Sequence, residues 1–156
     1  MKTGIQAYRR SILIAALAIG LIPAAAVAAS LDMMTTGGCS CCHAWARQMR
    51  AAGFEVTVKD LTMGQLARAK HVAGIPAMLG ACHTARIGGY VVEGHVPVRE
   101  IQKLLTERPD AIGLVVPGMP IGSPGMESGK RRDTYEVLLL KIDGSTEVFA
   151  RYASQP

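Results

Sequence analysis

The sequence predicts an α/β domain whose elements follow the order β-α-β-α-β-β-α. Three observations carry this prediction. Apolar residues recur at helical spacing in three segments, short alternating stretches typical of strands lie between them, and glycine or proline marks most boundaries. Residues 29–156 are enough to bury one hydrophobic core. We therefore expect a single domain.

The first half of this domain supplies two strands and two helices. We expect a strand over 31–35 and a helix over 42–52, in which Trp45 and Met49 share one face and which Gly53 ends. A second strand follows over 54–58, and a second helix covers 63–71. The segment Gly74-Ile75-Pro76 then ends the second helix.

The second half begins with a hairpin. We expect strands over 77–79 and 90–92 around Gly88-Gly89, and then a helix over 98–106. After a Gly/Pro/Met-rich loop over 109–127, a C-terminal β-hairpin of 135–142 and 147–152 turns at Asp143-Gly144. The element order is thioredoxin-like, and Pro76 stands where that superfamily places a cis-proline that faces a cysteine pair.

Residues 1–28 have the pattern of a secretory signal peptide. Three basic residues precede an apolar run over 12–22, and Ala26-Val27-Ala28 forms a small-residue cleavage site. The run is shorter than the roughly 20 residues that span a bilayer. We expect export, to the periplasm, of a domain of residues 29–156 that keeps no membrane anchor.

Charge excludes nucleic acid as the partner. The chain has a net charge of +5, and removing the three basic residues of the leader leaves +2. The only basic cluster in the remainder is Lys130-Arg131-Arg132, with no aromatic residues interleaved. A solvated loop explains such a cluster better than a nucleic-acid interface does.

The strongest chemical signal is the cluster of Cys39, Cys41 and Cys42 at a predicted strand-to-helix turn, where the positive end of the helix favours a thiolate. Three neighbouring sulfurs can bind a thiophilic metal or exchange disulfides. In an oxidising compartment the four cysteines could instead form structural bridges. The natural local bridge joins Cys39 to Cys42, which is also a redox arrangement.

The other candidate ligands are a thiol, two imidazoles and two thioethers. A strand that runs away from Pro76 would carry Cys82 and His83 about 20 Å beyond the cluster at roughly 3.3 Å per residue, whereas the returning strand brings His95 back to it. Met119 and Met126 lie in a repeated Pro-Gly-Met unit, where they could serve as soft ligands for Cu(I) or fill gaps under the loop.

These segments resemble a family of small exported proteins, catalogued as domain of unknown function 411 and described as predicted metal-binding proteins. The similar segments are the cysteine cluster with Trp45, residues 52–56, 74–76, 82–85, 93–97, 117–120 and 126–127. Ser40 stands where the family usually has glycine. The resemblance implies metal binding, most commonly copper handling, and no established catalytic reaction.

The leading hypothesis is an exported Cu(I)-binding protein in copper delivery or tolerance. Two or three thiolates of Cys39, Cys41 and Cys42 would hold the ion, with His95 and a thioether completing the shell. A Cys/His shell would also suit Zn(II). Binding should weaken at low pH, and a disulfide between Cys39 and Cys42 should abolish it. The partners we expect are the metal and a copper-donating or copper-accepting protein.

Two other functions compete with this hypothesis. A thiol:disulfide oxidoreductase would use Cys39 as the attacking thiolate and Cys42 as the resolving thiol, although Cys41 would then offer a second resolving group. A disulfide-stapled interaction module would have neither activity. We expect a binding protein rather than an enzyme, and we assign no catalytic residue.

Overall fold

The computed structural model describes residues 29–154, so the predicted signal peptide lies outside the described residues. The elements are β1 (Ser30–Thr36), α1 (Ser40–Ala51), β2 (Glu55–Leu61), α2 (Met63–Val72), the 3-10 helix η1 (Ala77–Leu79), β3 (Thr84–Ile87), β4 (Tyr90–Glu93), α3 (Val98–Glu107), β5 (Gly113–Val115), β6 (Tyr135–Leu140) and β7 (Thr146–Tyr152). The order β-α-β-α-β-β-α is therefore confirmed up to α3, and the C-terminal hairpin is confirmed as β6 and β7.

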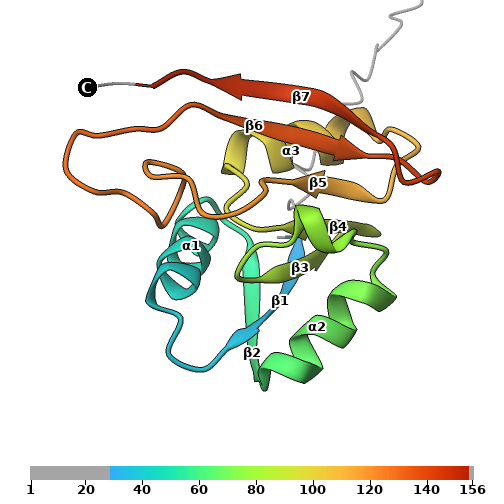
Figure 1. The fold of residues 1–156 in the computed structure, drawn as a ribbon, viewed down its shortest axis with the longest axis horizontal. Coiled ribbons are helices and arrows are strands. Elements are labelled where there is room, and N and C mark those ends of the chain that lie inside the picture. The colour runs from blue at the N-terminus through green and yellow to red at the C-terminus, as the bar shows by residue number, and fades with distance from the viewer. Residues whose placement is uncertain (1–28, 155–156) are drawn as a thin grey trace, which may run out of the picture.

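All seven strands belong to one sheet in the order β2-β1-β3-β4-β5-β6-β7 (Figure 1). Strand β1 pairs parallel with β2 and antiparallel with β3. Strand β4 pairs antiparallel with β3 and parallel with β5. The C-terminal hairpin extends this sheet by pairing β6 with β5.

The sheet is packed on both faces. Helices α1 and α3 join the larger core cluster through residues such as Trp45, Met49 and Ile101. The smaller cluster includes Ala73 and Ile75, which follow α2. Adjacent residues of β4 and β5 belong to different clusters, because successive strand side chains point to opposite faces. Among the described residues, no helix has the length and apolar character needed to cross a membrane.

The segment after Pro76 differs from the prediction. Residues 77–79 form a 3-10 helix rather than a strand, with the amide of Leu79 donating to the carbonyl of Pro76 at 2.9 Å. The described residues also contain no cis peptide bond, so the expectation of a cis-proline at Pro76 was wrong. The strand that we expected here begins only at Thr84.

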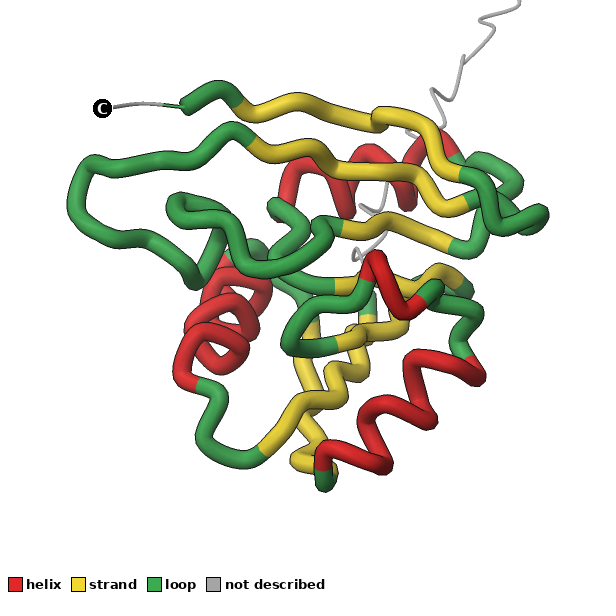
Figure 2. The backbone as a smooth tube through the Cα atoms, in the orientation of Figure 1, coloured by secondary structure: helices red, strands yellow, loops and turns green. Residues whose placement is uncertain are grey.

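The loop predicted over 109–127 contains a strand. Residues Gly113–Val115 form β5 in the middle of the sheet, and all three are buried. Gly113 is required at this position, because an added Cβ would lie 1.7 Å from the carbonyl oxygen of Val91. The longer irregular segment, residues 116–134, follows β5 and lies beside α1 in Figures 1 and 2.

Candidate metal centre

The first turn of α1 presents the cysteine cluster. Gly38 adopts a positive φ of 83°, and Cys39 is the N-cap of the helix, with its amide donating to the carbonyl of Thr36 at 3.3 Å. A disulfide joins Cys39 to Cys42, whose Cα atoms are 5.3 Å apart. The local bridge that the spacing suggested is thus present.

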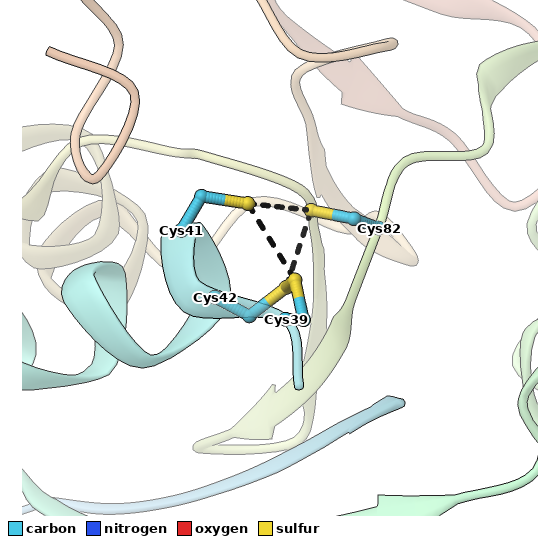
Figure 3. A group of neighbouring side chains, drawn as sticks. All are labelled: Cys39, Cys41, Cys42 and Cys82. Atoms are coloured by element: carbon cyan, nitrogen blue, oxygen red, sulfur yellow. Dashed lines mark hydrogen bonds between the residues drawn. A yellow bond between two sulfur atoms is a disulfide. The ribbon is translucent and has the colours of Figure 1, made fainter. Parts of the chain in front are cut away.

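Cys82 lies directly against this cluster (Figure 3). Its Sγ atom is 3.3 Å from Sγ of Cys42 and 3.9 Å from Sγ of Cys41, and Sγ of Cys41 is 3.5 Å from Sγ of Cys39. The expectation that Cys82 and His83 lie about 20 Å away was therefore wrong. Four sulfur atoms come within 4.8 Å of one another, and Cys41 and Cys82 are free thiols.

Strand register explains why Cys82 lies here. Thr84 pairs with Met34 near the C-terminal end of β1, which is the end that leads to the cysteine turn. Thr84 also pairs with Glu93, the last residue of β4. The residues just before β3 and just after β4 are therefore brought to the cysteine end of the sheet, which places both Cys82 and His95 at the cluster.

A buried ionic network holds the segment before β3, and sequence reasoning missed it. The carboxylate of Glu93 is fully buried and accepts hydrogen bonds from the amide of Ala81 at 2.6 Å and from the hydroxyl of Thr84 at 2.5 Å. It also binds the ammonium of Lys70 at 2.5 Å. A charged residue at the end of the apolar run Tyr90-Val91-Val92 was the signal that could have revealed this network.

His95 is oriented by the loop that follows β5. Its Nδ1 atom lies 2.8 Å from the carbonyl oxygen of Pro124, which can only accept a hydrogen bond, so Nδ1 carries the proton. The Nε2 atom is left as an acceptor, 3.0 Å from Sγ of Cys82. A carbonyl that fixes the tautomer in this way prepares the other ring nitrogen to bind a metal.

His83 is fully buried between two other rings. Its centroid is 4.5 Å from the Trp45 ring and 4.9 Å from the His95 ring, and its Nδ1 atom is 3.6 Å from Sγ of Cys82. Among the residues that the structure describes, its Nε2 atom has no hydrogen-bond partner. Cys82, His83 and His95 thus form a second group of close ligand atoms, which shares Cys82 with the four-sulfur group.

Burial dominates the protonation of these groups. It raises the pKa of the Cys82 thiol to about 12, with a further contribution from neighbouring Cys41. It lowers the pKa of His83 well below its ordinary value, and the charges of His95 and Lys70 act in the same direction. Burial also lowers the pKa of His95. The histidines are therefore neutral at pH 7, as metal ligands must be.

The loop between β5 and β6 covers the cluster mainly with its backbone. Gly125 adopts a φ of 86°, and an added Cβ would meet the carbonyl oxygen of Cys41 at 2.6 Å and the amide nitrogen of Trp45 at 2.8 Å. Glu127 fixes this contact, because its carboxylate accepts from Gln48 at 2.7 Å and from the amide of Gly125 at 2.9 Å.

The two methionines of this loop differ in exposure. The side chain of Met119 is 53% exposed, whereas Met126 is half-buried and directly follows Gly125, the residue that packs on the first turns of α1. Of the two thioethers, Met126 is the better placed to approach the cluster.

The donor set suits a soft metal ion. Four sulfurs converge, the prepared imidazole nitrogen of His95 lies beside one of them at Cys82, and His83 adds a buried nitrogen that has no hydrogen-bond partner among the described residues. Thiolate and imidazole ligands favour copper or zinc, whereas magnesium, calcium and manganese prefer oxygen. The same geometry brings two free thiols next to a disulfide, so thiol–disulfide exchange is the other chemistry that the site permits.

Comparisons with known proteins agree with this donor set. Residues 79–126 match the family described as "Protein of unknown function, DUF411". Two solved structures of a copper resistance protein, copG forms 2 and 1, are similar to the chain. Form 2 is 42% identical, with 81% of this chain and 99% of that chain covered and a TM-score of 0.77. Form 1 is 43% identical, with 80% and 97% covered and a TM-score of 0.75.

No match was found among curated proteins. The identity to copG extends over nearly the whole of that protein, and the family match covers both Cys82 and the loop that contacts the cluster. The chain belongs to the DUF411 family, and its fold is similar to that of the copper resistance protein copG.

Proposed function

We propose that this protein binds Cu(I) as its cargo, in copper delivery or tolerance, through the thiolates of Cys39, Cys41, Cys42 and Cys82. The convergence of four sulfur atoms within 4.8 Å carries this proposal. Cu(I) prefers soft sulfur donors, and the similarity to a copper resistance protein favours copper over zinc. Zn(II) remains the second metal that the donors would accept.

The imidazole of His95 would complete the shell through Nε2, because its Nδ1 proton is engaged by Pro124. His83 already belongs to the second group, with Cys82 and His95, so it would bind a metal held there rather than one held among the four sulfurs. Met126 is the thioether that we place at the edge of this site, and Met119 would reach it only by a movement of the loop. Each ligand must lose or lack a proton, so binding weakens as pH falls.

The disulfide between Cys39 and Cys42 provides a redox control of binding. When it is present, only Cys41 and Cys82 remain as free thiols, with their sulfurs 3.9 Å apart. Two thiols can still hold Cu(I), although with fewer donors. We therefore expect oxidation to weaken binding rather than to abolish it.

The place of action follows from the leader. We propose that residues 1–28 direct export and that the domain of residues 29–156 works in the periplasm, where the disulfide can persist. We further infer a thioredoxin-like core in the part of the sheet formed by β2, β1, β3 and β4 with helices α1, α2 and α3. The parallel pair β1 and β2 and the antiparallel hairpin β3 and β4 support this classification.

A thiol:disulfide oxidoreductase is the second candidate, and the Cys39–Cys42 disulfide at a helix N-terminus is the observation that favours it. In that reaction two substrate thiols would become a disulfide as the Cys39–Cys42 bond is reduced to two thiols. The crowding of Cys41 and Cys82 against the pair opposes a clean exchange, because each offers another resolving thiol.

An anaerobic competition titration separates the two functions. The reduced protein is titrated with Cu(I) against a chromogenic chelator, with Zn(II) in parallel and Cys39→Ser as the variant. We expect tight stoichiometric Cu(I) binding that weakens strongly in the variant. Failure to compete for Cu(I), together with reduction of a model disulfide, would replace the copper proposal with the oxidoreductase.

A further inference from the structure

A cavity of about 230 Å³ opens beside Cys82, between α2 and the segment before β3. Most of its wall residues come from the helix on one side and from that segment on the other, and Thr36 at the end of β1 completes the lining. The residues from the helix and the segment are Met63, Leu66, Ala67, Lys70, Ala81 and Cys82. The half-buried thiol of Cys82 therefore contacts two regions. One is the cysteine cluster, and the other is this cavity.

Met63 is the second sulfur-bearing residue of the cavity. It is the first residue of α2, and its side chain is 74% exposed. The start of the helix does not depend on it, because Thr62 and Gln65 form a capping box. Leu66, which is 4% exposed, provides the buried contact of the helix. The Met63 thioether is thus available for a ligand.

The one cationic side chain of the cavity lining is paired with a carboxylate. Lys70 is the only lining residue with an ionisable cationic group, and its ammonium is bound to the carboxylate of Glu93 at 2.5 Å. The other walls are mostly aliphatic, and none of the lining residues is acidic. A hard cation finds no carboxylate ligand here, whereas a soft ion finds a thioether at one side and a thiol at the other.

We propose that this cavity is the route by which Cu(I) reaches the cluster, with Met63 as a transfer ligand that first holds the ion together with Cys82. This inference rests on the proposed Cu(I) binding. The Cys82 thiol gives its proton to solvent as the Cu–Sγ bond forms. The bond from copper to the Met63 sulfur then breaks as the thiol of Cys41 or Cys42 gives its proton to solvent and its sulfur binds the copper. Copper stays as Cu(I) throughout, and no electron is transferred.

The test compares two exposed methionines. Met63→Leu keeps an apolar side chain of similar size and removes the sulfur. Met78→Leu is the matched control, because Met78 is 87% exposed and is not a wall of this cavity. Transfer of Cu(I) from a chromogenic chelator to each reduced protein is followed by stopped-flow absorbance, and the equilibrium affinity is measured by titration.

We expect Met63→Leu to slow uptake about tenfold, with an equilibrium affinity within about threefold of the wild type, because a transfer ligand changes the barrier and not the final shell. Met78→Leu should load at the wild-type rate. A second variant, Ala67→Phe, fills the cavity from an exposed helix position and should also slow uptake.

The outcomes distinguish the two proposals. Uptake by Met63→Leu at the wild-type rate, or equal slowing in both leucine variants, would overturn the transfer role while leaving the cluster as a copper site. A wild-type protein that takes up no Cu(I) at equilibrium would overturn the proposed function, and the route with it.

Discussion

The cysteine turn and the Pro-Gly-Met loop both reach the candidate site, but they contribute different groups. The turn brings side chains, since the sulfurs of Cys42 and Cys41 lie 3.3 Å and 3.9 Å from the sulfur of Cys82. The loop brings mainly backbone, through the Pro124 carbonyl on His95 and the Gly125 contact with α1. The loop therefore shapes and orients the candidate site mainly through its backbone, with Met126 as the thioether that could add to it.

We expect the largest loss of stability from a change in the Glu93 network, which holds the segment that carries Cys82 and which we call its anchor. Glu93→Gln removes the charge that pairs with Lys70 and weakens the bonds to Ala81 and Thr84. Breaking a buried pair in this way should lower the free energy of unfolding by about 3 kcal/mol. Chemical denaturation measures this loss. Glu107→Gln is the control, because its pair with Lys103 is exposed and should contribute almost nothing. Equal effects of the two variants would show that the network is not an anchor.

The backbone contact of the loop gives the next largest effect. Gly125→Ala adds a Cβ that clashes with Cys41 and Trp45, and Gly118→Ala is a matched control in the same loop with a positive φ of 69° and open space. Both variants carry a conformational cost of about 1 kcal/mol, and the clash should add about 1 to 3 kcal/mol at Gly125 only. Thermal unfolding would therefore show a lower midpoint for Gly125→Ala. Identical midpoints would mean that the loop does not pack tightly on α1.

The two methionines of the loop test whether it also supplies a sulfur ligand. Met126→Leu should weaken Cu(I) binding by roughly threefold to tenfold if its sulfur completes the shell. Met119→Leu should leave the affinity unchanged, because that side chain is largely exposed. The measurement is a chelator competition on the reduced proteins. A loss of Cu(I) affinity only in Met119→Leu would show that Met119, and not Met126, is the thioether ligand. Unchanged affinity in both variants would mean that the loop contributes only backbone groups to the site.

The smallest effect that we expect is a change in stability with pH. Burial lowers the pKa of His83 and His95 below the ordinary 6.5, so the unfolded chain takes up protons near that pH while the folded chain does not. The contribution of these two neutral histidines to the free energy of unfolding is therefore fully present above pH 6.5 and is lost progressively as pH falls below it. Unfolding of the reduced, metal-free protein at about pH 7.5 and about pH 5.5 measures this slope. The variant His95→Gln should flatten it, and an unchanged slope would assign the effect to other groups.

Much of the fold followed from periodicity and turn residues. The order of elements up to α3, the end of α1 near Gly53 and the C-terminal hairpin at Asp143-Gly144 agree with the pattern of apolar and turn residues. The strand β5 was missed, since its three residues lie between segments rich in proline and glycine. Only pairing with β4 and β6 makes such a short segment a strand.

The site was harder to predict, because one wrong strand assignment misplaced Cys82. Assigning 77–79 to a strand carried Cys82 away from the cluster, whereas η1 delays the strand until Thr84 and keeps Cys82 beside the turn. The predicted position of His95 did not suffer from this error, since it depends only on the return of β4 to the cysteine end of the sheet. Spacing along the chain could not reveal the pairing of Thr84 with Met34, which is a tertiary contact.

The central claim is that Cys82 joins the cysteine turn in a single copper site. X-ray absorption at the copper edge of the reduced, Cu(I)-loaded protein tests it most directly, because it counts the sulfur atoms bound to the ion. We predict a shell dominated by sulfur, with fewer sulfur neighbours in Cys82→Ser and no change in Met119→Leu. A shell that is the same in the wild type and in Cys82→Ser would contradict the claim and return the site to the three cysteines of the turn.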